Sequence, residues 1–140
     1  MRQGLLLLFL LFCLPACDRG DGPPVVVADI EITPPRPGAD MSAGYLQIRN
    51  NSRDVISITR VDSPQFERVA IHQTTMEDGV ARMRPADAIV IQAGQTAVLE
   101  RGGMHLMLMR PVPDADRVTL NLYADDVLVV SVDTEIRRGN

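Results

Sequence analysis

The chain has 140 residues, of which 46% are hydrophobic, and a formal net charge of −4. This size and composition fit one ordinary globular domain with a leader segment. The fourteen basic residues are all arginine and, apart from Arg137-Arg138, are scattered along the sequence. An acidic chain without a basic patch is not expected to bind nucleic acid.

The first residues predict export. Arg2 precedes an apolar run over residues 5–14, which is too short for the roughly 20 residues of a membrane-spanning helix. Leu14-Pro15-Ala16-Cys17 follows and resembles a lipobox, the site where lipoprotein signal peptidase cuts before a cysteine that carries lipid. We therefore predict a lipoprotein signal peptide over residues 1–16. An ordinary signal peptide with a chance cysteine is the alternative.

Cys17 would then be the lipidated residue and residues 17–24 a flexible Gly/Pro-rich tether. Asp18 favours retention in the inner membrane, facing the periplasm, by a rule that varies between Gram-negative bacteria. The other cysteine, Cys13, belongs to the leader. The domain predicted over residues 25–140 therefore has no disulfide, no redox cysteine pair and no thiolate metal ligand.

Beyond the tether, short β-type runs alternate with turn signals. No apolar stripe of helical period reaches the roughly 10–12 residues that indicate a helix. Eight to ten short strands at this spacing predict an all-β single domain, a Greek-key β-sandwich or partly closed barrel. The expected strands are residues 25–33, 43–49, 55–61, 68–74, 80–84, 88–91, 97–101, 104–109, 118–123 and 127–132.

Both histidines of the chain, His72 and His105, and five of its seven methionines fall within residues 72–109. Thioether sulfur selects Cu(I) over harder ions, and imidazole also suits copper. Isolated methionines usually fill gaps in a core, and we assign Met76 and Met104 to that role or to the rim of the domain. The remaining cluster predicts a site for a soft metal ion.

Strand alternation places the ligands of the second half of this cluster. Side chains two residues apart on a strand lie on the same face. If Leu106 and Leu108 point into the core, then His105, Met107 and Met109 share the opposite face.

The same argument applies to the first half. Val69 and Ile71 are natural core residues, which turns His72 away from the core. The Asp-Gly turn at residues 77–79 predicts a hairpin that brings Met83 back towards the strand of His72. Two ligand pairs thus lie on non-core faces, and the spacing allows them to converge into one site near the surface, with two nitrogen and two sulfur ligands.

The arrangement His72-x10-Met83-x21-His105-x-Met107 resembles the signature of the periplasmic copper chaperones called PCuAC. The resemblance extends over residues 25–133. It is carried by Ala43-Gly44-Tyr45-Leu46-Gln47-Ile48-Arg49-Asn50, by Gly79-Val80-Ala81-Arg82-Met83-Arg84-Pro85 and by Gly102-Gly103-Met104-His105-Leu106-Met107-Leu108.

This resemblance implies a cupredoxin-like fold and one Cu(I) ion held by His72, Met83, His105 and Met107. It also implies delivery of Cu(I) to the dinuclear copper centre of cytochrome c oxidase, alongside thioredoxin-like Sco proteins that supply thiol chemistry. Three features depart from the family pattern: Ile71 precedes the first ligand, Ala81 replaces a frequent methionine, and a His/Met-rich tail is missing. We therefore expect one principal site.

The residue types present also bear on other functions. A blue-copper electron carrier needs a cysteine ligand, and a zinc hydrolase favours histidine with carboxylate and an open position, so we expect no enzyme. A periplasmic copper-buffering or resistance protein would use the same ligands without a dedicated receiver. A β-sandwich interaction module with incidental methionines is the weaker alternative.

Overall fold

The computed structural model of the chain describes residues 22–113 and 115–136. The predicted signal peptide, the predicted lipidation at Cys17 and most of the predicted tether lie outside these residues. Within them the protein is built from β-strands, which confirms the all-β prediction. The described part of the chain contains no helix long and apolar enough to cross a membrane.

Each expected run corresponds to one strand, except that 55–61 forms two. Thr59 separates these two strands, and its backbone N–H donates to the carbonyl oxygen of Tyr123. The strands are β1 (Val25–Ile32), β2 (Met41–Asn50), β3 (Ile56–Ile58), β4 (Arg60–Asp62), β5 (Phe66–Glu77), β6 (Val80–Pro85), β7 (Ile89–Ile91), β8 (Thr96–Leu99), β9 (Met104–Pro111), β10 (Arg117–Ala124) and β11 (Val127–Glu135).

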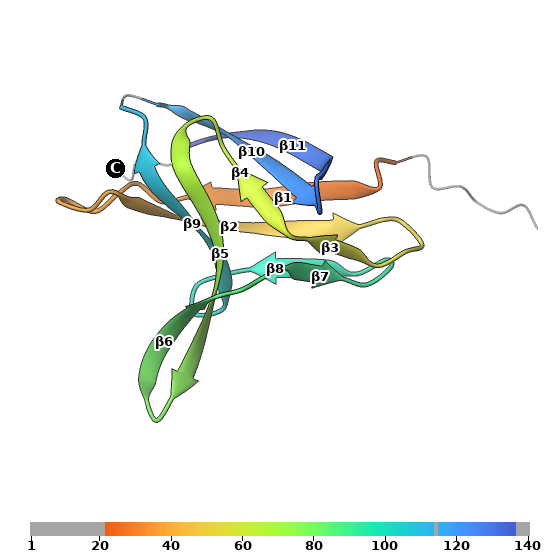
Figure 1. Cartoon of the computed structure of the whole chain (residues 1–140), viewed down its shortest axis with the longest axis horizontal. Coiled ribbons are helices and arrows are strands. Elements are labelled where there is room, and N and C mark those ends of the chain that lie inside the picture. The colour runs from red at the N-terminus through yellow and green to blue at the C-terminus, as the bar shows by residue number, and fades with distance from the viewer. Residues whose placement is uncertain (1–21, 114, 137–140) are drawn as a thin grey trace, which may run out of the picture.

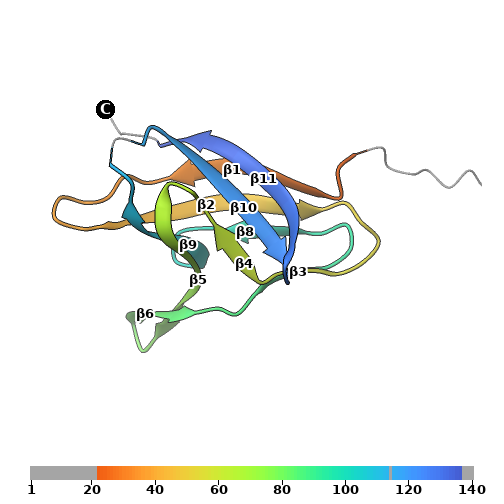
Figure 2. The ribbon, with the colours of Figure 1, turned by 45° about the horizontal axis from the view of Figure 1, so that its top comes forward.

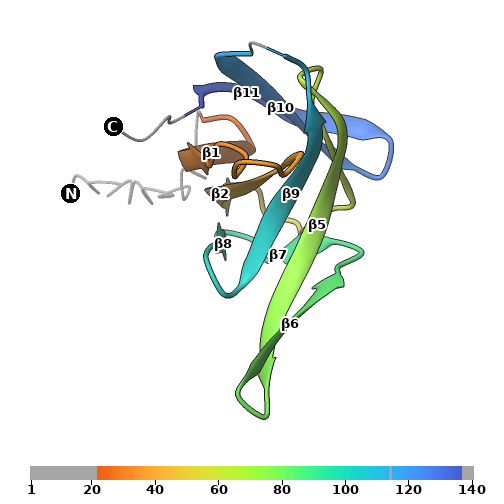
Figure 3. The same ribbon diagram turned by 90° about the vertical axis from the view of Figure 1, so that its left-hand side faces the viewer.

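The strands form a large sheet and two small ones. The large sheet has the order β1-β2-β9-β5-β6, with β8 pairing β2 beside β9. A three-stranded sheet, β11-β10-β4, lies across β1 and β2, and β3 pairs with β7 (Figures 1 and 2). The β5–β6 hairpin extends beyond the rest of the domain (Figure 3). Strand β9 is thus central in the large sheet, while β6 is at its edge.

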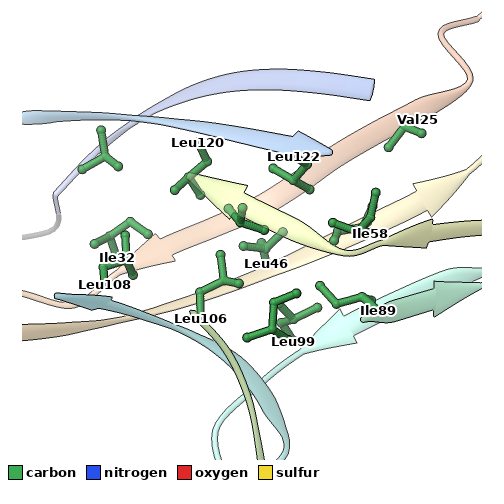
Figure 4. Packing of buried hydrophobic residues seen from close by; sticks show 14 of the residues in the cluster. Val25, Ile32, Leu46, Ile58, Ile89, Leu99, Leu106, Leu108, Leu120 and Leu122 are labelled. Atoms are coloured by element: carbon green, nitrogen blue, oxygen red, sulfur yellow. The ribbon is translucent and has the colours of Figure 1, made fainter. Parts of the chain in front are cut away.

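A single apolar core fills the space between the sheets (Figure 4). Alternate residues of β2, β9 and β10 point into it, as the period of two requires. Leu106 and Leu108 of β9 are fully buried, as predicted. Ile71 of β5 is 6% exposed, and Val69 packs against the core from a half-buried position. The sequence prediction of which residues of β5 and β9 face the core is therefore confirmed.

The structure explains why a glycine, Gly44, occurs in the middle of β2. Its position faces the core, where an added Cβ would lie 3.0 Å from Leu108 Cδ1, 3.1 Å from Ile32 Cδ1 and 3.3 Å from Leu106 Cβ. A side chain there would be in tight contact with packed neighbours, so glycine gives the side chains of Leu108 and Ile32 room over β2.

Asn50, at the end of β2, is fully buried. Its side-chain amide donates to the carbonyl oxygens of Asp54 and Ile91, at 2.7 and 3.0 Å, and its Oδ1 accepts from Ser52. The neighbouring Asn51 binds the carbonyl oxygens of residues 23 and 24. The last two residues of the predicted tether are therefore attached to the domain.

Candidate metal centre

The outer face of the large sheet carries the four predicted ligands. On β9, His105 and Met107 lie on the face opposite Leu106 and Leu108, because successive side chains alternate. On β5, His72 lies opposite Ile71 in the same way. Strands β9 and β5 are hydrogen-bonded neighbours, so the two parts of the cluster meet on one surface.

The two histidines form a cross-strand pair. His72 is directly opposite His105 in the β5–β9 ladder. Their ring centroids are 6.1 Å apart, with the rings nearly perpendicular at 74°. Two imidazoles that bind one ion through nitrogens at about 2 Å have ring centres roughly 5–6 Å apart. The pair is therefore within reach of a shared ion after a small adjustment.

His105 is held in a fixed orientation. Its Nδ1 lies 3.1 Å from the carbonyl oxygen of Gly103. A carbonyl can only accept, so Nδ1–H is the donor and Nε2 keeps a free lone pair. The same carbonyl accepts the backbone N–H of Thr74 at 3.0 Å, which ties the end of β9 to β5.

His105 is also more enclosed than the sequence predicts. It lies on the non-core face as expected, but it is only 4% exposed. Tyr45 covers it from β2, with ring centroids 6.4 Å apart, and His72 covers it from β5. Aromatic neighbours on both sides therefore exclude water from this residue.

The Nδ1 atom of His72 indicates that a ligand binds at this site. This atom is buried and has no hydrogen-bond partner among the described residues. Buried polar atoms are normally paired, so this nitrogen fits a bound partner such as a metal ion. Burial, followed by the charges of His105 and Arg68, lowers the pKa of His72 below its usual value of 6.5. A lowered pKa keeps the imidazole neutral, which is the form that binds metals.

Met83 reaches the same face through the predicted hairpin. Asp78 and Gly79 form a two-residue turn between β5 and β6, with positive φ angles of 51° and 78°, typical of a type I′ turn. The turn sets Met83 opposite Thr74, two residues along β5 from His72. Because β6 is at the edge of the sheet, Met83 is 51% exposed.

Met107 lies between two small neighbours. Ala43 of β2 and Ala70 of β5 are its cross-strand partners, and their methyl groups leave space around the thioether. Met107 and Met83 both line a cavity of about 390 Å³. The two predicted sulfur ligands therefore face one hollow, on the face of the sheet that also carries the two imidazoles.

Three residues with no role in the sequence prediction complete this region. Tyr45 and Arg101 line the same cavity. The Arg101 guanidinium lies over the Tyr45 ring, 4.6 Å from its centroid, and pairs with Glu31 at 2.5 Å. Strand alternation places Tyr45 on the outer face, but only the β1–β2 pairing and the fold of the loop after β8 bring Glu31 and Arg101 to it.

The other methionines of the domain lie in different environments. Met104 packs against the core and Met76 is 66% exposed on the hairpin, in line with the roles of filler and rim. Met109 shares the face of Met107, as predicted, and Met41 is its cross-strand partner.

The donor set is soft. Among the described residues no group of three or more His, Cys, Asp or Glu side chains could hold a metal ion. What the outer face offers instead is two imidazoles and two thioethers, a combination that prefers Cu(I) to harder ions.

Several solved structures share this fold. The copper-bound PCuAC domain from PmoF2 is 17% identical over 81% of this chain and 92% of that one, with a TM-score of 0.63. The solution structure of CuI-DR1885 from Deinococcus radiodurans is 26% identical, covers 85% of this chain and 82% of that one, and has a TM-score of 0.64. The fold predicted as cupredoxin-like and the resemblance to PCuAC are thereby confirmed.

Comparison of sequences identifies one family. A search among curated proteins finds no match. A family model does match, over residues 25–136, and its description is "Putative lipoprotein LpqE-like". The match spans most of the chain and all four predicted ligands. The chain therefore belongs to the LpqE-like family.

Proposed function

We propose that this protein binds one Cu(I) ion through His72, Met83, His105 and Met107. The observation that carries the proposal is the cross-strand His72–His105 pair, in which one buried ring nitrogen has no hydrogen-bond partner within the part of the chain that the structure describes. Two thioethers, Met83 from β6 and Met107 from β9, line one cavity on the same face of the sheet. Similarity to a copper-bound PCuAC domain and to CuI-DR1885 supports the choice of ion.

Copper is cargo in this proposal. The protein acts as a non-enzymatic copper chaperone that carries Cu(I) to a receiver. Neutral thioethers hold Cu(I) without the negative charge of a thiolate, so receiver cysteines, as thiolates, are stronger soft ligands. Transfer proceeds by exchange, in which each new copper–ligand bond forms as an old one breaks and the ion remains Cu(I).

The two halves of the site suit different steps of that exchange. His105 and Met107 come from the central strand β9, and His105 is enclosed and hydrogen-bonded. Met83 comes from the edge strand β6 and is half exposed. Met83 is therefore the ligand that an incoming receiver displaces first, while the β9 pair keeps the ion in place.

The proposed setting is the periplasmic face of the inner membrane, with lipid on Cys17, a tether to residue 24 and the copper domain from residue 25. The family description as lipoproteins supports export and anchoring. The proposed receiver is the dinuclear copper centre of cytochrome c oxidase, with a Sco-type protein as partner. Mass spectrometry of the mature protein tests the anchor, since lipid on any residue other than Cys17 contradicts it.

The binding claim is tested by competition. Cu(I) is titrated into the wild type and into the His72→Ala/His105→Ala double variant in the presence of a Cu(I) chelator under anaerobic conditions. We expect a large loss of affinity in the double variant, and equal affinities would contradict the assignment. Met76→Ala is the matched control, because Met76 is an exposed methionine on the same hairpin but outside the cavity lining.

A periplasmic copper buffer would use the same ligands, and a deletion strain separates the two functions. For a chaperone, deletion lowers cytochrome c oxidase activity when copper is scarce, and added copper restores it. For a buffer, deletion leaves oxidase activity unchanged and raises sensitivity to excess copper.

A further inference from the structure

Two methionines outside the proposed ligand set lie together on the same face of the large sheet. Met41 of β2 and Met109 of β9 are direct cross-strand partners. Met109 is two residues from Met107 on one strand, so both point to the outer face. Same-face neighbours along a strand are about 7 Å apart, so the second pair of sulfurs lies one step from the first site.

These side chains do not have the usual role of methionine as core filler. Met41 is 44% exposed and Met109 is half-buried, whereas Ser42 and Leu108 beside them are buried. Two large apolar side chains that lie opposite each other and are partly exposed add little to the packing of the core. Their common property is a thioether side chain that is partly exposed to solvent.

The two methionine pairs are connected through hollows in the surface. Met41 lines the cavity of about 390 Å³ that also contains Met83 and Met107. It lines a second cavity, of about 190 Å³, together with Met109. Met41 thus lines both hollows. An ion that leaves Met107 can reach the sulfur of Met41 along the surface, without passing through the protein interior.

The charges around the second cavity balance. Its lining includes Asp40, Glu67, Arg68 and Arg110, which are two acidic and two basic residues. Glu67 and Arg110 form an ion pair at 2.5 Å, so the carboxylate has a partner already. The cavity has no excess of negative charge to attract a hard cation, so the sulfur atoms decide which ion binds.

From this geometry we infer that Met41 and Met109 form a second, weaker Cu(I) site, through which the ion enters or leaves the principal one. The site has two thioethers and no imidazole, so it binds less tightly than the four-ligand site. In the transfer step a Cu–S bond to Met41 or Met109 forms as the bond to Met107 breaks, and the ion stays Cu(I). The transfer role rests on the proposed function; the existence of the second site does not.

The test uses Ag(I), a soft ion that does not change oxidation state under these conditions, and the purified protein with 13C-labelled methionine methyl groups. We expect the Met83 and Met107 signals to shift with the first equivalent of Ag(I), and the Met41 and Met109 signals to shift together with a second. Met76 serves as the internal reference for nonspecific binding, because its side chain is more exposed than those of Met41 and Met83.

Two double variants separate the sites. Met41→Leu/Met109→Leu keeps side-chain volume and removes sulfur, and should lose the second equivalent while retaining the first. His72→Ala/His105→Ala should lose the first binding step, with Met41 and Met109 still responding. If the Met41 and Met109 signals shift no more than that of Met76, the second site is disproved. If those of Met83 and Met107 fail to shift first in the wild type, the proposed function fails instead.

Discussion

His72 and His105 are paired across the β5–β9 ladder, with ring centroids 6.1 Å apart, although 32 residues separate them in sequence. This one register contact joins the two halves of the candidate site. It has a direct consequence for pH. Protonation of either imidazole removes a ligand and places a positive charge beside the ion.

We therefore predict that Cu(I) affinity falls at acidic pH. Burial and neighbouring positive charge lower the pKa of His72, so this ligand keeps its neutral form to a lower pH than an ordinary histidine does. Affinity should decrease progressively as the pH falls below about 6.5. Chelator competition across this range measures it. Constant affinity down to about pH 4.5 would contradict the role of the histidines.

The same shift affects the stability of the copper-free protein. The unfolded chain binds a proton at the ordinary His72 pKa of 6.5, whereas the folded chain binds it only at lower pH. Stability contributed by neutral His72 is thus present above pH 6.5 and lost as the pH falls below it. Thermal unfolding of wild type and His72→Gln measures this contribution, and the variant should lose less stability than the wild type between pH 7 and 5.

Met83→Leu separates copper binding from folding. Leucine keeps the volume of the side chain but has no sulfur, and Met83 is half exposed at the edge of the sheet. We expect a lower Cu(I) affinity and a change in unfolding free energy within about 0.5 kcal/mol. Chelator competition and denaturant titration test the two parts. Unchanged affinity would remove Met83 from the ligand set.

Gly44→Ala should destabilise the fold. The added Cβ meets Leu106 Cβ, which is fixed to the backbone, at 3.3 Å, and the side-chain ends of Leu108 and Ile32 at 3.0 and 3.1 Å. Overpacking of this kind costs about 1–3 kcal/mol. Denaturant unfolding measures the loss, and a variant as stable as the wild type would show that β2 and β9 can move apart freely.

Asn50→Ala should cost more than Asn51→Ala. The buried Asn50 amide donates to the carbonyl oxygens of Asp54 and Ile91, and both bonds are lost in the variant, which leaves only the Ser52 hydroxyl on the Asp54 carbonyl. Unpaired buried groups cost about 1–3 kcal/mol each. Asn51 donates to the Pro23 carbonyl and accepts from Arg49, both at exposed positions, so its change should cost much less. Equal effects on the unfolding midpoint would contradict this account.

Much of this arrangement follows from local pattern. Alternation identified the outward face of His105, Met107 and Met109, and the Asp78-Gly79 turn predicted the hairpin that carries Met83. These features depend on residues close in sequence, where the period of two and the φ preference of glycine act directly.

The rest depends on which strands pair. The enclosure of His105 by Tyr45 requires β2 to lie beside β9, and the Met41–Met109 contact requires a particular register between them. A single sequence carries no local signal for either, because both are contacts between distant segments. For the same reason the position of Arg101 over Tyr45 could not be predicted.

X-ray absorption spectroscopy of the protein loaded with one equivalent of Cu(I) tests the central claim most directly. We expect a copper ion bound by two imidazole nitrogens and two thioether sulfurs, and one sulfur fewer when Met83 is replaced by leucine. A spectrum with only nitrogen and oxygen neighbours, or one that is unchanged in the His72→Ala/His105→Ala variant, would contradict it.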